Sequence, residues 1–175
     1  VLSKLAESSV ATIRVPNAGP AAARNAGARL ATGEYLVFLD ADDELLTGAL
    51  SAFATQHHRQ HRLVRSGALI DRGTQGTHTW FAEPSRHPYP RGAPLAGTFS
   101  IERALFHKVG GYDPKFRFGE NSEMLLRAQM ALQEVPNGPV FTQRPTVRRI
   151  VQVDRSKAHY HDHTLQAALR MLQMH

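Results

Sequence analysis

The chain has 175 residues, of which 42% are hydrophobic, a formal net charge of +6 and no cysteine. This size and composition predict one domain with a real core, and they exclude disulfides and thiolate metal sites. No apolar stretch approaches the roughly 20 residues of a membrane span, and residues 1–10 are not a signal peptide.

The positive charge comes mostly from scattered arginines, without Lys-rich tracts or an RNA-binding signature. Nucleic acid is therefore not an expected partner. Diphosphate substrates or an anionic membrane surface explain the excess equally well. The absence of cysteine also fits a reducing compartment.

The first half of the chain predicts a helix followed by a buried strand. Residues 10–15 are expected to form a short strand before them. A Gly-Pro pair and a later glycine bound a helix over residues 20–32. Residues 35–39 are a continuous apolar run, typical of a strand covered on both faces in a parallel α/β sheet.

Four acidic side chains, Asp40, Asp42, Asp43 and Glu44, follow that strand at the end where such sheets bind ligands. Two carboxylates separated by one residue can offer oxygens to one hard divalent ion, Mg²⁺ or Mn²⁺, which would also hold a substrate's phosphates. The other interpretation is an acidic, solvated turn that caps the next helix. The preceding apolar strand favours the metal site.

A helix capped by Thr47, with Leu50 on its buried face, is predicted next, followed by a strand over residues 63–70. The glycines and prolines of residues 71–94 indicate a long loop around a short piece at Trp80.

In the second half, Ser100 is predicted to cap a helix that ends near residue 109, and another helix begins near Asn121. Glu120 and Glu123 then lie at the amino end of the second helix, where backbone N–H groups favour negative charge. They either act on a substrate or merely complement the helix dipole.

Residues 140–143 and 147–153 are candidate strands. They complete a domain over residues 1–155. Residues 156–175 are predicted to form a helix whose apolar face packs on the domain, on a partner or on another copy of the chain.

Two blocks of this sequence carry a family resemblance. The run N-x-G-x-x-x-A-R-N-x-G, then A-x-G-E-Y and an apolar strand into D-x-D-D, resembles the family 2 glycosyltransferases of the GT-A fold. Residues 96–128 resemble that family's acceptor-side segment. The resemblance implies an α/β, Rossmann-like fold with a mostly parallel sheet flanked by helices. It also implies a metal-dependent transfer of a sugar from a nucleotide diphosphate to an acceptor hydroxyl.

The resemblance assigns the donor side of the site to the first block. Asp42 would coordinate the Mn²⁺ or Mg²⁺ ion, and Asp40 would contact the ribose or the metal. Asn17 and Arg24 would face the nucleotide, which is expected to be part of a UDP-sugar.

The second block would supply the acceptor side. Glu120 is expected to act as the general base toward the attacking hydroxyl, with Glu123 in reserve. The commonest family pattern has an aspartate where this chain has Asn121, which cannot serve as a base.

The implied acceptor is a sugar, a lipid-linked sugar or a polysaccharide of the cell envelope. A cytoplasmic location follows, either soluble or with peripheral membrane contact, and a homodimer is a further expectation. The family's usual first strand is not found ahead of Val1, so the chain is expected to be a fragment or to lack that strand.

Two alternatives stay open. An apolar strand ending in D-x-D also opens the haloacid-dehalogenase-like phosphatases, in which Asp40 would be the phosphoryl nucleophile. However, Asp43 and Glu44 follow where those enzymes usually carry Thr or Val. The other alternative is a degenerate, non-catalytic domain that only binds a sugar or nucleotide, because Asn121 occupies the base position.

Overall fold

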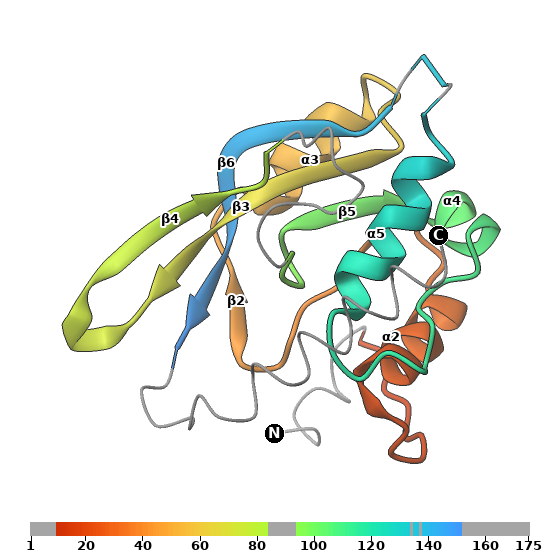
Figure 1. The fold of residues 1–175 in the computed structure, drawn as a ribbon, viewed down its shortest axis with the longest axis horizontal. Coiled ribbons are helices and arrows are strands. Elements are labelled where there is room, and N and C mark those ends of the chain that lie inside the picture. The colour runs from red at the N-terminus through yellow and green to blue at the C-terminus, as the bar shows by residue number, and fades with distance from the viewer. Residues whose placement is uncertain (1–9, 84–93, 134, 137, 152–175) are drawn as a thin grey trace.

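The computed structural model describes residues 10–83, 94–133, 135–136 and 138–151 (Figure 1). The expected helix over residues 156–175 lies outside them. In chain order the elements are α2 Gly19–Leu30, β1 Tyr35–Val37, β2 Asp43–Leu45, α3 Ala49–His57, β3 Leu63–Asp71, a 3₁₀ turn Gly73–Gln75, β4 Thr77–Phe81, β5 Phe99–Glu102, α4 Arg103–Lys108, α5 Glu120–Met130 and β6 Val140–Ile150. None of the helices in these ranges is long and apolar enough to cross a membrane.

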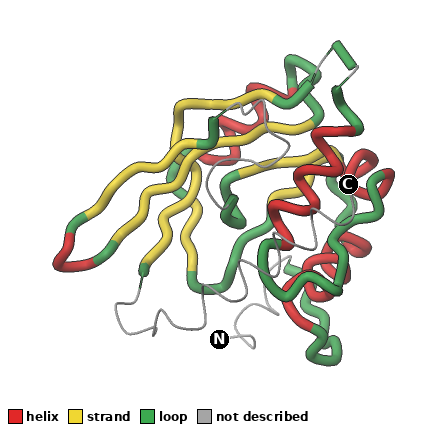
Figure 2. The backbone as a smooth tube through the Cα atoms, in the orientation of Figure 1, coloured by secondary structure: helices red, strands yellow, loops and turns green. Residues whose placement is uncertain are grey.

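The strands form one curled sheet in the order β1-β5-β3-β6-β2, and β4 pairs with the outer half of β3 (Figure 2). Of these pairings, only β3 with β6 is parallel, so a mixed sheet replaces the mostly parallel sheet that was predicted. One reason is the β3–β4 connection, because a short turn can join only antiparallel neighbours. The α/β class itself is confirmed.

Helices cover both faces of this sheet. In Figure 1, α5 lies in front of the strands and α3 behind them. The front face holds the main core, where the rings of Phe38, Phe99, Phe106 and Tyr112 meet between the sheet and α2, α4 and α5. On the other face, His57 of α3 bonds through Nε2 to the buried Ser100 hydroxyl at 2.8 Å. The apolar strands are therefore sandwiched, as their composition predicts.

Several element boundaries differ from the predicted ones. Residues 10–15 form no strand, and β1 stops at Val37, two residues early. Gly48, at φ 80°, precedes α3 in place of a Thr47 cap, and Leu50 is 60% exposed. Each strand or helix is short enough that tertiary contacts decide where it ends.

The later elements differ more. Ser100 lies inside β5 and caps no helix, and α4 begins only at Arg103. The short piece predicted at Trp80 within the long loop is the strand β4, which begins three residues earlier, at Thr77. The two predicted carboxyl-terminal strands are one strand, β6, which passes through Pro145 where the ladder to β3 shifts register. Such an irregularity is where a sheet tolerates proline.

Candidate active site

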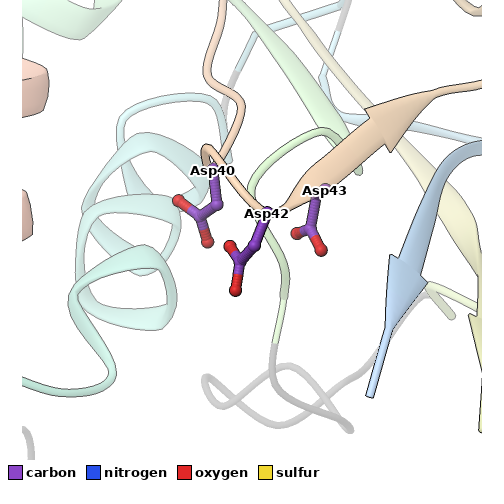
Figure 3. Close-up of side chains that lie close together, drawn as sticks. All are labelled: Asp40, Asp42 and Asp43. Atoms are coloured by element: carbon purple, nitrogen blue, oxygen red, sulfur yellow. The ribbon is translucent and has the colours of Figure 1, made fainter. Parts of the chain in front are cut away.

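Three carboxylates converge just after β1. Asp40 and Asp42 lie in the turn that leads to β2, and Asp43 begins that strand (Figure 3). The Asp43 N–H donates to the Asp40 carbonyl at 3.1 Å, which closes the turn. One oxygen from each side chain lies within 4.8 Å of the others. The turn therefore places three hard oxygen ligands close enough to share one ion.

Asp43 is the member that fits a cation best. Its Oδ2 is buried and has no hydrogen-bond partner within the described part of the chain. Burial raises the pKa of Asp43 to about 6, with Asp40 and Asp42 adding to the rise and Arg149 opposing it. A buried carboxylate oxygen without a donor is costly, and a divalent ion would satisfy it. The cluster therefore fits Mg²⁺ or Mn²⁺.

Arg24 of α2 connects this cluster to α5. Its Nη2 donates to Asp40 Oδ1 at 2.5 Å, and its Nη1 donates to Glu120 Oε1 at 2.6 Å. Its guanidinium carbon lies 5.5 Å from the centre of the Tyr112 ring. Burial acts to lower the pKa of Arg24, but the hydrogen bonds to Glu120 and Asp40 raise it above its ordinary value. The guanidinium is therefore a fixed positive charge between two carboxylates.

Next to Arg24, Asn25 ties α2 to the loop that precedes α5. Its Nδ2 donates to the Tyr112 carbonyl at 2.7 Å, and its Oδ1 accepts from the Tyr112 N–H at 2.9 Å. The Tyr112 hydroxyl donates to Asn121 Oδ1 at 3.0 Å. Burial raises the pKa of Tyr112, so this hydroxyl keeps its proton. Asn121 thus has a structural bond in this chain.

Glu123 is bonded to Arg127, whereas Glu120 is bonded to Arg24. The Glu123 side chain is fully buried, and both of its oxygens accept from Arg127 at 2.5 Å. Arg127 also donates to the carbonyls of Val109 and Gly111. The pair therefore fastens α5 to the end of α4.

The hydrogen bond that the structure gives Asn17 is local to its own segment. Asn17 lies in the exposed segment before α2, where its Oδ1 accepts from the Gly19 N–H at 3.3 Å. Of the predicted site residues, the structure brings together Asp40, Asp42, Arg24 and Glu120. Sequence reasoning did not single out Asp43 as a third ligand, nor Asn25 and Tyr112 as the support. The signal for Asn25 was its place in the A-R-N run.

The fold and the carboxylate turn after β1 define a GT-A glycosyltransferase domain. The fold matches that of S. aureus TarS residues 1–349 in complex with UDP-GlcNAc, with a TM-score of 0.59 and 18% identity over 90% of this chain and 47% of that chain. It also matches GalNAc-T7 with UDP, GalNAc and Mn²⁺, with a TM-score of 0.53 and 19% identity over 78% of this chain and 31% of that one.

The sequence profile of Glycosyl transferase family 2 matches residues 1–122, and this chain belongs to that family. It is 30% identical over 159 residues to polypeptide N-acetylgalactosaminyltransferase 5 of Caenorhabditis elegans, covering 70% of this chain and 25% of that protein. It is 41% identical over 54 residues to the Campylobacter jejuni GalNAc(5)-diNAcBac-PP-undecaprenol beta-1,3-glucosyltransferase, covering 31% of this chain and 18% of that protein. The chain thus spans a quarter or less of these relatives. The family assignment sets aside the phosphatase alternative.

Proposed function

We propose that this chain transfers a sugar from a nucleotide diphosphate to an acceptor hydroxyl, with a divalent cation at Asp40, Asp42 and Asp43. The observation that supports it is the convergence of three carboxylates, one of which, Asp43, has a buried oxygen with no hydrogen-bond partner among the described residues. When bound, Mn²⁺ or Mg²⁺ would stabilise the negative charge of the departing diphosphate.

Glu120 takes the role of general base in this proposal. Its Oε1 is held by Arg24, and no second bond to its carboxylate is found among the described residues. A base must have an oxygen free to accept the proton of the attacking hydroxyl. Glu120 meets this requirement, whereas both oxygens of Glu123 are occupied by Arg127.

The substrate class is inferred from chemistry and from the relatives. TarS and GalNAc-T7 were each solved with UDP or a UDP-sugar, which supports a UDP-sugar as donor here. The undecaprenol glucosyltransferase supports a sugar or a lipid-linked sugar as acceptor. A polysaccharide of the cell envelope would offer the same kind of hydroxyl group. We also propose that the protein acts in the cytoplasm, with peripheral membrane contact, and that it forms a homodimer. The proposed chemistry does not depend on these three points.

The test measures nucleotide release from UDP-, GDP- and dTDP-sugars with and without Mn²⁺. Asp42→Asn should reduce turnover by about 100-fold or more, since it removes charge that acts on the transition state. Glu44→Gln is the matched control, because Glu44 is exposed on β2 and outside the cluster. Turnover that survives chelation or Asp42→Asn would contradict the metal role. Nucleotide binding without any turnover would support the non-catalytic alternative.

A further inference from the structure

One guanidinium serves two carboxylates with different proposed roles. Arg24 Nη2 binds Asp40 and Nη1 binds Glu120, at 2.5 and 2.6 Å. The side chains of Arg24 and Glu120 are only 12% and 11% exposed, and that of Asp40 is 31% exposed. These contacts join α2, the carboxylate turn and the first residue of α5. They are therefore poorly screened by solvent.

The geometry makes the two contacts dependent on each other. The guanidinium is a rigid planar fork, so its nitrogens cannot move independently. The Tyr112 ring lies beside it, and the neighbouring Asn25 is bonded twice to the Tyr112 backbone. Arg24 therefore has little freedom to hold one carboxylate without affecting the other.

We infer that Arg24 is a positioning residue that couples the cation-binding turn to Glu120. The inference rests on the proposed function of Asp40 and Glu120. Asp40 attracts Arg24 less when it also shares its charge with a cation, so Arg24 then holds Glu120 more firmly. By thermodynamic reciprocity, the charge of Glu120 must change the affinity of the turn for the cation. Binding of the cation on the donor side thus orients Glu120 on the acceptor side.

A double-mutant cycle on Mn²⁺ affinity tests this coupling. Free Mn²⁺ is measured by electron paramagnetic resonance for the unaltered chain, Arg24→Gln, Glu120→Gln and the double variant. In Glu120→Gln, Asp40 is the only charged partner of Arg24 in this pair of contacts, so Arg24 neutralises more of the Asp40 charge. Mn²⁺ binding should therefore weaken. We expect this weakening to be about fivefold larger with Arg24 present than in the Arg24→Gln background.

Two further variants keep the test decisive. Arg24→Lys keeps the charge but lacks the two-pronged fork, so it replaces Arg24→Gln if that variant does not fold, and it should also lose the coupling. Arg62→Lys alters the ion pair with Glu102 elsewhere in the fold and should leave Mn²⁺ affinity unchanged.

The two proposals fail in different ways. If Glu120→Gln has the same effect, within twofold, in both backgrounds, Arg24 does not couple the sites, while the proposed function stands. If the unaltered chain binds no Mn²⁺, the cation assignment falls, and this inference falls with it.

Discussion

The ionised Asp43 side chain lowers the stability of the folded chain while it provides a ligand for a cation. Its pKa is about 6 in the folded chain, against an ordinary value of 3.8, because the carboxylate is buried among other acids. The folded state thus binds this proton more tightly than the unfolded state does. The stability that the protonated form provides is complete below pH 3.8 and is lost as the pH rises through about 6.

Asp43→Asn should therefore stabilise the metal-free protein at neutral pH. We expect a free energy of unfolding about 1–2 kcal/mol higher at pH 7.5, discounted because the side chain is partly exposed. The difference should shrink as the pH falls to 4.5. Urea denaturation in EDTA at several pH values measures it, and a gain that is the same at every pH would contradict this explanation.

At this scale the D-x-D spacing predicted which residues could share an ion, because Asp40 and Asp42 are neighbours in sequence. The same local reasoning could not find the Arg24–Glu120 contact, which joins residues 96 positions apart. It also gave no local reason to prefer Glu120 over Glu123, since both lie in the first turn of a helix, and only the family resemblance ranked Glu120 first. Only the packing of α5 shows that the Glu123–Arg127 pair, whose members are four residues apart on that helix, faces the end of α4.

Between elements, the Glu123–Arg127 pair joins α5 to α4. Glu123→Gln would leave the partly buried Arg127 without its counter-charge, and we expect a loss of about 2–4 kcal/mol in the free energy of unfolding. Glu102→Gln is the matched control, because its ion pair with Arg62 is more exposed and should cost about 1 kcal/mol or less. Thermal or urea denaturation measures both. Equal losses in the two variants would contradict a tertiary role for Glu123.

Helices were easier to predict than strands in this chain. The Gly-Pro start of α2 and the apolar spacing of α5 are local signals, and both helices are present. Strand partners and directions depend on distant segments, so the antiparallel contacts of β5 with β1 and β3 were not predictable. Ser100 illustrates the difference, because its cap-like sequence is overridden by pairing inside β5.

For the whole molecule, ligand binding should appear as a gain in stability. If UDP and Mn²⁺ bind only the folded state, an excess of about 100 times the dissociation constant adds about 2.7 kcal/mol. For a chain of this size that corresponds to a rise of about 5–10 °C in the unfolding midpoint. Thermal scans with UDP, Mn²⁺ and both together measure the rise, and Asp42→Asn should abolish the part that requires Mn²⁺. A midpoint that neither ligand moves would contradict a nucleotide site.

The β3–β4 hairpin is a suitable place to attach a fluorescent probe. Its tip at Gly73–Gln75 is exposed and projects away from the helices and from the carboxylate turn (Figure 1). With no native cysteine to compete, a single Thr74→Cys substitution would take one maleimide dye at a defined position. Fluorescence anisotropy of that dye would report encounters with vesicles or large acceptors while leaving every residue of the proposed site untouched.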